Sequence, residues 1–146
     1  MTEKSFDADH WHSRAAPSLG EFERMAAAAY GRLPENFRAL CRDVVILVAD
    51  FPDEDVLKEI EAESPFDLLG LFSGIGLPQD SAVAETGRLP NHIYLYRRPI
   101  LDYWAEHDET LGSIVTHVLV HEIGHHFGMS DDDMERIEAL ADAEAR

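Results

Sequence analysis

The pattern of apolar and polar positions divides the chain into short helices and strands. Apolar residues recur at helical spacing in LGEFERMAAAAYGRL, which follows Ser18, and in LPENFRALC, where Pro34 begins a second short helical turn. Glu21 lies three residues after Ser18, and this spacing predicts a capping box at the start of the first helix. The acidic segment DEDVLKEIEAE is typical of a short, exposed helix.

Three further segments have the character of strands. VVILVADFP (44–52) carries a continuous apolar, branched run stopped by a proline, so we expect a strand buried on both faces. SPFDLLGLFSGIGLP (64–78) is apolar but interrupted by glycines, which favours a strand with a bend or bulge. HIYLYRRPI (92–100) alternates, which places Tyr94 and Tyr96 on the face opposite the branched residues.

The last third of the chain predicts two helices. A long one runs from about Asp108 to His126 or Phe127, and a final one runs from about Asp131 to the end. The polar stretch QDSAVAETGRLPN, which separates the second and third strands, is expected to be a connection.

Length and composition agree with one globular domain. The 146 residues suit one modest hydrophobic core, and 45% of them are hydrophobic. We expect an α+β domain at 18–146, in which a small sheet packs against helices, and a flexible arm at 1–17. The single cysteine, Cys41, allows no intrachain disulfide, which fits a reducing compartment, and we expect it to be a small buried residue.

Charge and hydropathy argue against two classes of partner. The net charge of −17 repels phosphate backbones and so argues against nucleic acid. No apolar run approaches the ~18 residues of a membrane span, and the polar N-terminal segment shows no secretory signal. We therefore expect a soluble, cytoplasmic protein without nucleic-acid or membrane partners, whereas no oligomeric state follows from these features.

The segment HEIGHHFGMSD, which starts at His121, has the pattern of a metal site. On a helix with about 100° per residue, His125 lies about 40° from His121 and one turn further along, so both imidazoles can reach one point. Glu122 lies beside that point, about 60° from His125. In the H-E-x-x-H pattern two neutral imidazoles bind Zn²⁺, and the carboxylate next to them acts as the general base toward water.

The residues around this pattern favour a buried site with a third ligand. The helix is apolar on nearly all sides, and a metal supplies the partner that buried His and Glu side chains need. Gly128 can adopt the left-handed conformation that ends a helix, and the spacing of the extended motif then selects Asp131. With His121, His125 and Asp131 as protein ligands of one zinc ion, water takes the fourth position, as in catalytic sites. The two aspartates after Asp131 are expected to begin the last helix.

The other histidines carry weaker patterns. His126 points to another side of the helix and is expected to be buried and hydrogen-bonded. His117 lies one turn before His121, and we favour a packed histidine there over one that lines the pocket. His92 and His107 belong to no pattern.

The chain also resembles a known family. HEIGHHFGMSD matches the signature H-E-x-x-H-H-F-G-x-x-D of short bacterial zincin-like proteins identified as zinc metallopeptidases. LPENF, VVILVADFP, PFDLLGLFSGIGLP and LPNHIYLYRRPIL are similar as well, so the resemblance spans roughly Phe22 to Glu138. It implies a minimal zincin-like fold, with a small mixed sheet packed on an active-site helix and flanking helices. It also implies zinc on the residues matching His121, His125 and Asp131, with Glu122 as the general base.

The resemblance implies a substrate and a way of binding it. Zinc-dependent hydrolysis of a peptide or protein is expected, with extended peptide pairing to an antiparallel edge strand beside the active helix. The strand near Leu68 to Ser73 is the candidate edge, and a plain core strand is the alternative. Tyr94, Tyr96 and Tyr103 are candidates for stabilising the oxyanion, although packing is the commoner role of strand tyrosines. Two other functions stay open: a metal-binding regulatory or interaction module without proteolysis, and a hydrolase of a non-peptide amide.

Overall fold

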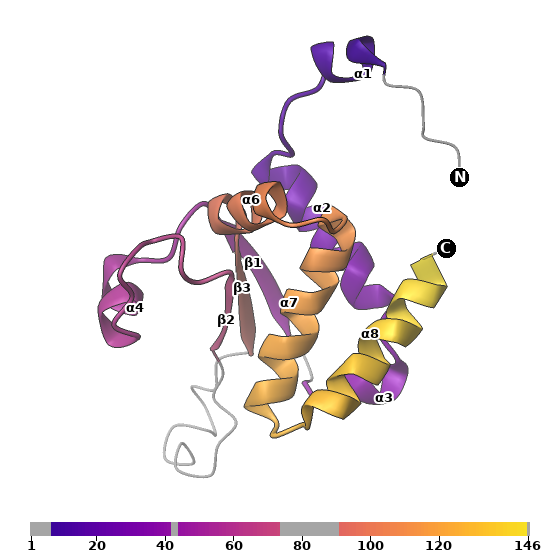
Figure 1. Ribbon diagram of the computed structural model, residues 1–146. Coiled ribbons are helices and arrows are strands. Elements are labelled where there is room, and N and C mark those ends of the chain that lie inside the picture. Colours follow the sequence, from indigo (N-terminus) through magenta and orange to yellow (C-terminus); the bar gives the residue numbers. More distant parts are fainter. Residues whose placement is uncertain (1–6, 42–43, 74–90, 146) are drawn as a thin grey trace.

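The computed structural model describes residues 7–41, 44–73 and 91–145 of the chain. Helices and short strands alternate along these ranges, and the expected α+β class is confirmed (Figure 1). The elements are α1 (Ala8–His12), α2 (Leu19–Gly31), α3 (Glu35–Arg38), β1 (Val45–Ala49), α4 (Glu54–Glu59), β2 (Gly70–Ser73), β3 (His92–Tyr96), α6 (Arg97–Glu106), α7 (Leu111–His126) and α8 (Asp131–Ala145).

The three strands form a mixed sheet in the order β1-β3-β2. β1 runs parallel to β3, with Ile46 opposite Ile93, and β2 runs antiparallel to β3, with Leu71 opposite Tyr94. This arrangement confirms the small mixed sheet. It also leaves β2 at one edge of the described sheet and β1 at the other.

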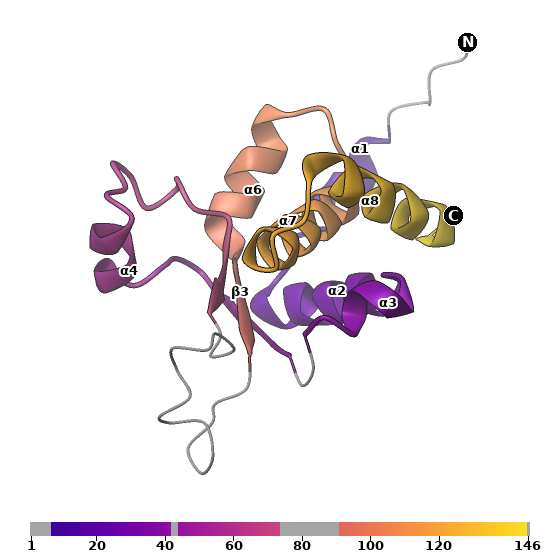
Figure 2. The same ribbon diagram turned by 90° about the horizontal axis from the view of Figure 1, so that it is seen from below.

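Helix α7 lies at the centre of the fold. It packs against β2 and β3 on one side and against α2, α6 and α8 on the others. Figure 1 shows α8 running beside α7, and Figure 2 shows the sheet on one side of α7 and α2 and α8 on the other. Fully buried side chains from these elements form one core: Phe22, Phe37, Ile93, Leu95, Ile100, Ile114, Leu119, Ile123 and Met134.

The residues at the starts of the first helices correctly predicted where these helices begin. The Ser18 hydroxyl accepts a hydrogen bond from the Glu21 backbone N–H at 3.1 Å, and the Glu21 carboxylate accepts one from the Ser18 N–H at 2.8 Å. The expected capping box is therefore present. Pro34 directly precedes α3, and the exposed acidic segment forms α4 as expected.

The prediction that the first strand is buried on both faces is wrong. Ile46 and Val48 pack against the core, whereas Leu47, on the opposite face of β1, is 36% exposed. β1 lies at the sheet edge, and the helical core covers one face of it, so its second apolar face has no comparable cover. A continuous apolar run therefore did not require burial on both sides.

The third strand is shorter than expected, because α6 begins at Arg97. Pro99 lies in the first turn of α6, a position where proline is tolerated because its missing N–H has no partner within the helix. The predicted faces of the strand are confirmed. The rings of Tyr94 and Tyr96 stack at 6.2 Å with 9° between their planes, and Ile93 on the other face is fully buried.

The second apolar segment forms a strand only at Gly70–Ser73 in the described ranges. The bend or bulge expected at its later glycines and most of the polar connection after it lie outside the described residues. A Cβ atom at position 70 would lie 2.6 Å from Cγ1 of Val118 and 2.9 Å from the Tyr94 carbonyl oxygen. Glycine is therefore needed where β2 meets α7.

The N-terminal segment contains the one-turn helix α1, which buries none of its residues. The flexible arm expected at 1–17 stays a prediction, and its first six residues lie outside the described ranges. Cys41 is buried, as expected. In the part of the chain that the structure covers, no helix combines the length and hydrophobicity needed to cross a bilayer.

Candidate metal centre

Helix α7 carries the H-E-x-x-H segment and ends where the sequence predicted. Thr110 caps its start, accepting a hydrogen bond from the Ser113 N–H at 3.2 Å. Gly128 has a φ angle of +74°, the left-handed conformation that glycine adopts readily. The Met129 N–H donates to the Gly124 carbonyl at 2.8 Å, and α8 then begins at Asp131. The chain reverses at this turn, so α8 returns alongside α7.

Three histidines, spaced four residues apart, form a stripe along α7. The ring centroids of His117 and His121 are 3.9 Å apart, and those of His121 and His125 are 5.4 Å apart. The spacing of four residues brings successive imidazoles to the same side of a helix. This stripe therefore extends the predicted histidine pair by one turn toward the start of α7.

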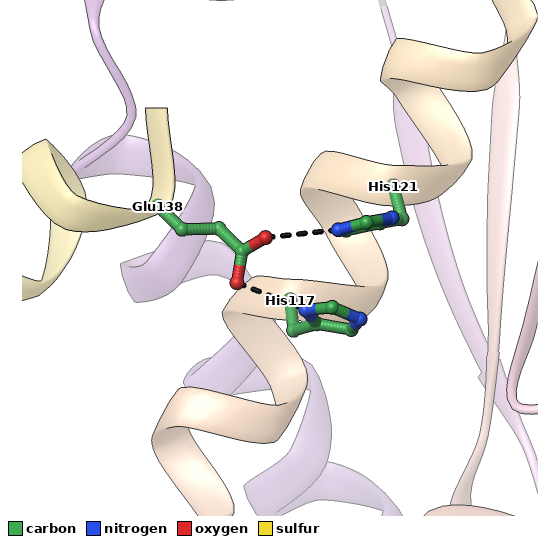
Figure 3. A group of neighbouring side chains, drawn as sticks. All are labelled: His117, His121 and Glu138. Carbon is green, nitrogen blue, oxygen red and sulfur yellow. Dashed lines mark hydrogen bonds and ion pairs between the residues drawn. The ribbon is translucent and has the colours of Figure 1, made fainter. Parts of the chain in front are cut away.

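Glu138 on α8 binds the first two histidines of the stripe. His117 Nδ1 donates to Glu138 Oε1 at 2.9 Å, and His121 Nε2 donates to Glu138 Oε2 at 2.9 Å. Figure 3 shows the carboxylate reaching from α8 to both imidazoles. One ligand atom from each of the three residues lies within 4.8 Å of the others, so the group has the dimensions of a metal site.

The structure brings the predicted ligands only partly together. His121 belongs to the group with His117 and Glu138, whereas His125 and Asp131 do not. His125 is exposed beside His121, and Asp131 lines the same open cavity of about 520 Å³ as His117, His121 and Glu138. The assignment of His121, His125 and Asp131 as one ligand set therefore stays a prediction.

Glu122 faces the sheet rather than α8. It is half-buried, and burial raises the pKa of its carboxyl group, while a hydrogen bond from the Phe72 backbone and the charge of His125 act in the opposite direction. A carboxyl group with a raised pKa beside a candidate metal ligand has the environment of a proton-transfer group.

Strand β2 directs alternate backbone groups away from its partner β3, and one of them, at Phe72, hydrogen-bonds Glu122. The Leu69 carbonyl accepts a hydrogen bond from the Tyr96 N–H at 3.0 Å, which places Leu69 in a hydrogen-bonded pair with β3. In antiparallel strands the backbone groups of alternate residues point away from the partner, so those of Gly70 and Phe72 point off the sheet edge. The strand predicted as the substrate edge is thus an edge strand of the described sheet and lies beside α7.

Two other histidines differ from expectation. The packed role favoured for His117 is wrong, because 49% of its side chain is exposed and it contacts Glu138. The pocket-lining alternative describes it better. His126 is half-buried, its ring lies 4.1 Å from the Phe72 ring, and burial lowers its pKa. His126 is therefore only partly buried and packs on an aromatic ring, whereas full burial and a hydrogen bond were expected.

Glu138 is the site residue that the sequence analysis missed. Its signal lies in a second stripe: Asp131, Glu135, Glu138 and Asp142 recur on α8 at helical spacing, and all four line the cavity beside His117 and His121. Comparing this acidic stripe with the histidine stripe of the preceding helix would have indicated a contact between Glu138 and the histidines.

Among the candidate tyrosines, Tyr96 has the strongest connection to Glu122. Burial raises the Tyr96 pKa to about 12, and the charges of Asp53 and Glu122 add to this shift after that of Tyr94. Its hydroxyl therefore keeps its proton at neutral pH. Tyr103 instead stacks on His107, with ring centroids 3.7 Å apart.

The donor set fits zinc. Imidazole nitrogens and carboxylate oxygens are ordinary zinc ligands, and His121 offers one imidazole to either neighbour in the stripe. Carboxylates on α8 line the cavity beside it. The residues present can thus hold a divalent ion between α7 and α8.

A family model described as zincin-like metallopeptidase matches residues 41–140. The chain belongs to this family. The expected zincin-like identity is confirmed, and the match runs from before β1 into α8, so it includes both helices of the candidate centre. Membership of the zincin-like family implies a metal, usually zinc, and hydrolase chemistry at the family level. A search of curated proteins found no match.

Proposed function

We propose that this zincin-like protein is a zinc-dependent peptidase. The observation that carries the proposal is the placement of Glu122, a half-buried carboxyl group of raised pKa between His125 on α7 and β2, an edge strand of the described sheet. His121, His125 and Asp131 are proposed to bind one zinc ion. The single cysteine suits a reducing compartment, so we propose that the protein acts in the cytoplasm.

The ligand residues need one local rearrangement. His121 now donates to Glu138 and would turn toward His125 to share an ion with it. Asp131 supplies the carboxylate, and the turn at Gly128 has already brought it to the cavity that His121 lines. When bound, zinc supplies Lewis acidity to water and to the substrate carbonyl.

Glu122 is proposed to move the proton. Its carboxylate oxygen takes a proton from the attacking water and then gives it to the nitrogen that leaves as the peptide bond breaks. Because burial raises its pKa, the group is a better proton acceptor than an exposed glutamate and also a competent donor. Tyr96 is the proposed hydrogen-bond donor to the developing negative charge on the carbonyl oxygen.

Strand β2 is proposed to bind the substrate backbone. An extended peptide can pair with the outward backbone groups of Phe72, replacing the hydrogen bond that the Phe72 backbone makes to Glu122, as peptides pair with other exposed sheet edges. Such pairing brings a peptide carbonyl past Glu122, because the Phe72 backbone already contacts that side chain. The proposed substrate class is therefore an extended peptide or a flexible protein segment.

The test compares wild type with Glu122→Gln. Both proteins are loaded with zinc, their metal content is measured, and each is assayed on a peptide library. We expect equal zinc content and a loss of turnover of about 10²–10⁴-fold, the usual contribution of a general base. Glu106→Gln changes an exposed glutamate at the end of α6 and serves as the matched control. Stoichiometric zinc with no cleavage of any peptide by wild type would count against a peptidase.

A metal-dependent binding module is the second candidate function. The observation in its favour is that His121 is held by Glu138 and not by the predicted ligand set. A metal bound between α7 and α8 could then stabilise a surface without catalysing hydrolysis. Zinc binding in both proteins, no turnover by either, and a defined partner bound equally by wild type and Glu122→Gln would favour this function.

A further inference from the structure

We propose that His117, His121 and Glu138 form a second divalent-cation site, which competes with the proposed catalytic ligands for His121. The cation is of the zinc class, because the donors are two imidazoles and one carboxylate. The existence of this site does not depend on peptidase chemistry. Its regulatory consequence does rest on the proposed function, since the competition matters only if His121 also serves catalysis.

The geometry of the group is already close to that of a bound ion. Each imidazole lies 2.9 Å from a different oxygen of the same carboxylate, and the chosen ligand atoms all lie within 4.8 Å. A tetrahedral zinc ion with bonds of about 2.0–2.1 Å needs ligand atoms roughly 3.3 Å apart. Small side-chain rotations therefore suffice, with the cation replacing the protons that His117 and His121 now donate.

The two helices that carry the group are held in register by packing. Met134 on α8 is fully buried against Gly124 on α7, where a Cβ atom would lie 2.4 Å from the Met134 sulfur. Glu138 lies one helical turn beyond Met134 and so faces the histidine stripe. The group is thus positioned by the core, although its side chains reach solvent.

The surroundings favour entry of a cation. The group lines an open cavity of about 520 Å³ between α7 and α8. The carboxylates of Asp131, Glu135 and Asp142 line the same cavity, and none of the described residues that line it is a lysine or an arginine. Negative groups that converge on an open site raise the local concentration of cations.

Sharing of His121 makes the two sites mutually exclusive. A neutral imidazole has one nitrogen with a free lone pair, so it binds one cation at a time. His121 lies between His117 and His125 on the stripe and can serve only one of them in a given molecule. A cation held by His117 and Glu138 therefore withdraws His121 from His125 and Asp131, which makes this second site inhibitory toward the proposed reaction.

The experiment is a calorimetric titration with Zn²⁺ of the metal-free full chain. His125→Gln/Asp131→Asn removes the ligands unique to the catalytic set, and His117→Gln/Glu138→Gln removes those unique to the second site. We expect wild type to bind one Zn²⁺ and each double variant also to bind one. Combining all four substitutions should weaken binding at least about tenfold, since even indirect partners of metal ligands contribute that much. Glu144→Gln, which changes an exposed glutamate of α8 that does not line the cavity, is the matched control and should change the affinity less than twofold.

Three results would overturn the inference. No zinc binding by folded His125→Gln/Asp131→Asn would show that the contact with Glu138 only ties two helices together. If the variant with all four substitutions bound zinc as tightly as His125→Gln/Asp131→Asn does, His117 and Glu138 would not be ligands. Binding of two zinc ions by wild type would contradict the sharing of His121.

A different result would distinguish this inference from the proposed function. If only His117→Gln/Glu138→Gln fails to bind zinc, the second site is supported and the proposed catalytic ligand set is wrong. Circular dichroism without metal confirms that each variant is folded. Where a double variant is not folded, a single change with the same expected direction replaces it: His125→Gln for the catalytic set and Glu138→Gln for the second site.

Discussion

Two carboxylates on neighbouring helices of this protein have opposite surroundings. Glu122 is half-buried against β2, whereas Glu138 lies at the open side of α7 and accepts hydrogen bonds from two imidazoles. The position of Glu122 beside His121 and His125 was predictable, because it follows from the spacing of the three residues within one helix. Glu138 was not predicted, because its partners lie on another helix and its position depends on how the two helices pack.

Cys41 offers a prediction at the residue scale that is independent of any metal. Burial raises the pKa of its thiol, so the folded protein keeps the proton to higher pH than the unfolded chain does. The resulting stability is present below the unfolded pKa of about 9 and is lost as the pH rises through the folded pKa. Between pH 8 and 10.5, wild type should therefore lose more free energy of unfolding than Cys41→Ala, as measured by urea denaturation at each pH.

The comparison with Cys41→Ala separates this effect from packing. The substitution removes a buried sulfur and should lower stability by about 1–2 kcal/mol at neutral pH. This loss should shrink as the pH rises above 9. A difference between the two proteins that stays constant over the whole range would show that the thiol does not titrate differently in the folded state.

At the scale of elements, most of the chain was predictable where the signal is local. The capping box of α2, the stop at Gly128 and the final helix all depend on residues a few positions apart. The exposed face of β1 and the early start of α6 were not predicted. Apolar character does not say how many neighbours a strand will have, and Pro99 is compatible with both a strand end and a first helical turn.

The contact between α7 and α8 gives a prediction at this scale. A Cβ atom at position 124 would lie 2.4 Å from the Met134 sulfur and 2.8 Å from its Cγ. Gly124→Ala should therefore push α8 outward and lower the free energy of unfolding by about 1–3 kcal/mol, the usual effect of overpacking. Urea denaturation of the metal-free protein measures the change.

Gly112→Ala is the matched control on the same helix. A Cβ atom there meets nothing within 4 Å, so the substitution should be neutral or stabilising by about 0.4–1 kcal/mol. If Gly124→Ala were as stable as Gly112→Ala, the packing that positions Glu138 and Asp131 would be looser than the structure indicates.

On the scale of the whole molecule, α7 separates two polar regions. Glu122 faces the sheet edge on one side, and His117 and His121 face the acidic stripe of α8 on the other. Part of the net charge of −17 is thus concentrated on one face of α8, beside the candidate metal centre. The sequence gives the members of both stripes, but their alignment depends on the buried contact between the helices and could not be derived from spacing alone.

Metal should therefore stabilise the fold as a whole. Both proposed sites join α7 to α8, and a ligand at 100 times its dissociation constant adds about 2.7 kcal/mol of stability. For a domain of this size we expect zinc to raise the unfolding midpoint by roughly 5–10 °C and a chelator to reverse the effect. His121→Gln removes a ligand from both sites and should abolish the zinc effect, whereas the exposed His12→Gln should retain it. An equal midpoint shift in His121→Gln and wild type would place the stabilising ion elsewhere.

The most direct test of the proposed catalytic site is a crystal structure of the wild-type protein with one equivalent of zinc, located by its anomalous scattering. We predict an ion bound by His121, His125 and Asp131, with Glu122 beside it, the contact between His121 and Glu138 broken, and the edge of β2 open to a peptide. An ion confined to His117, His121 and Glu138, or bound away from His121 altogether, would contradict this account of the catalytic site.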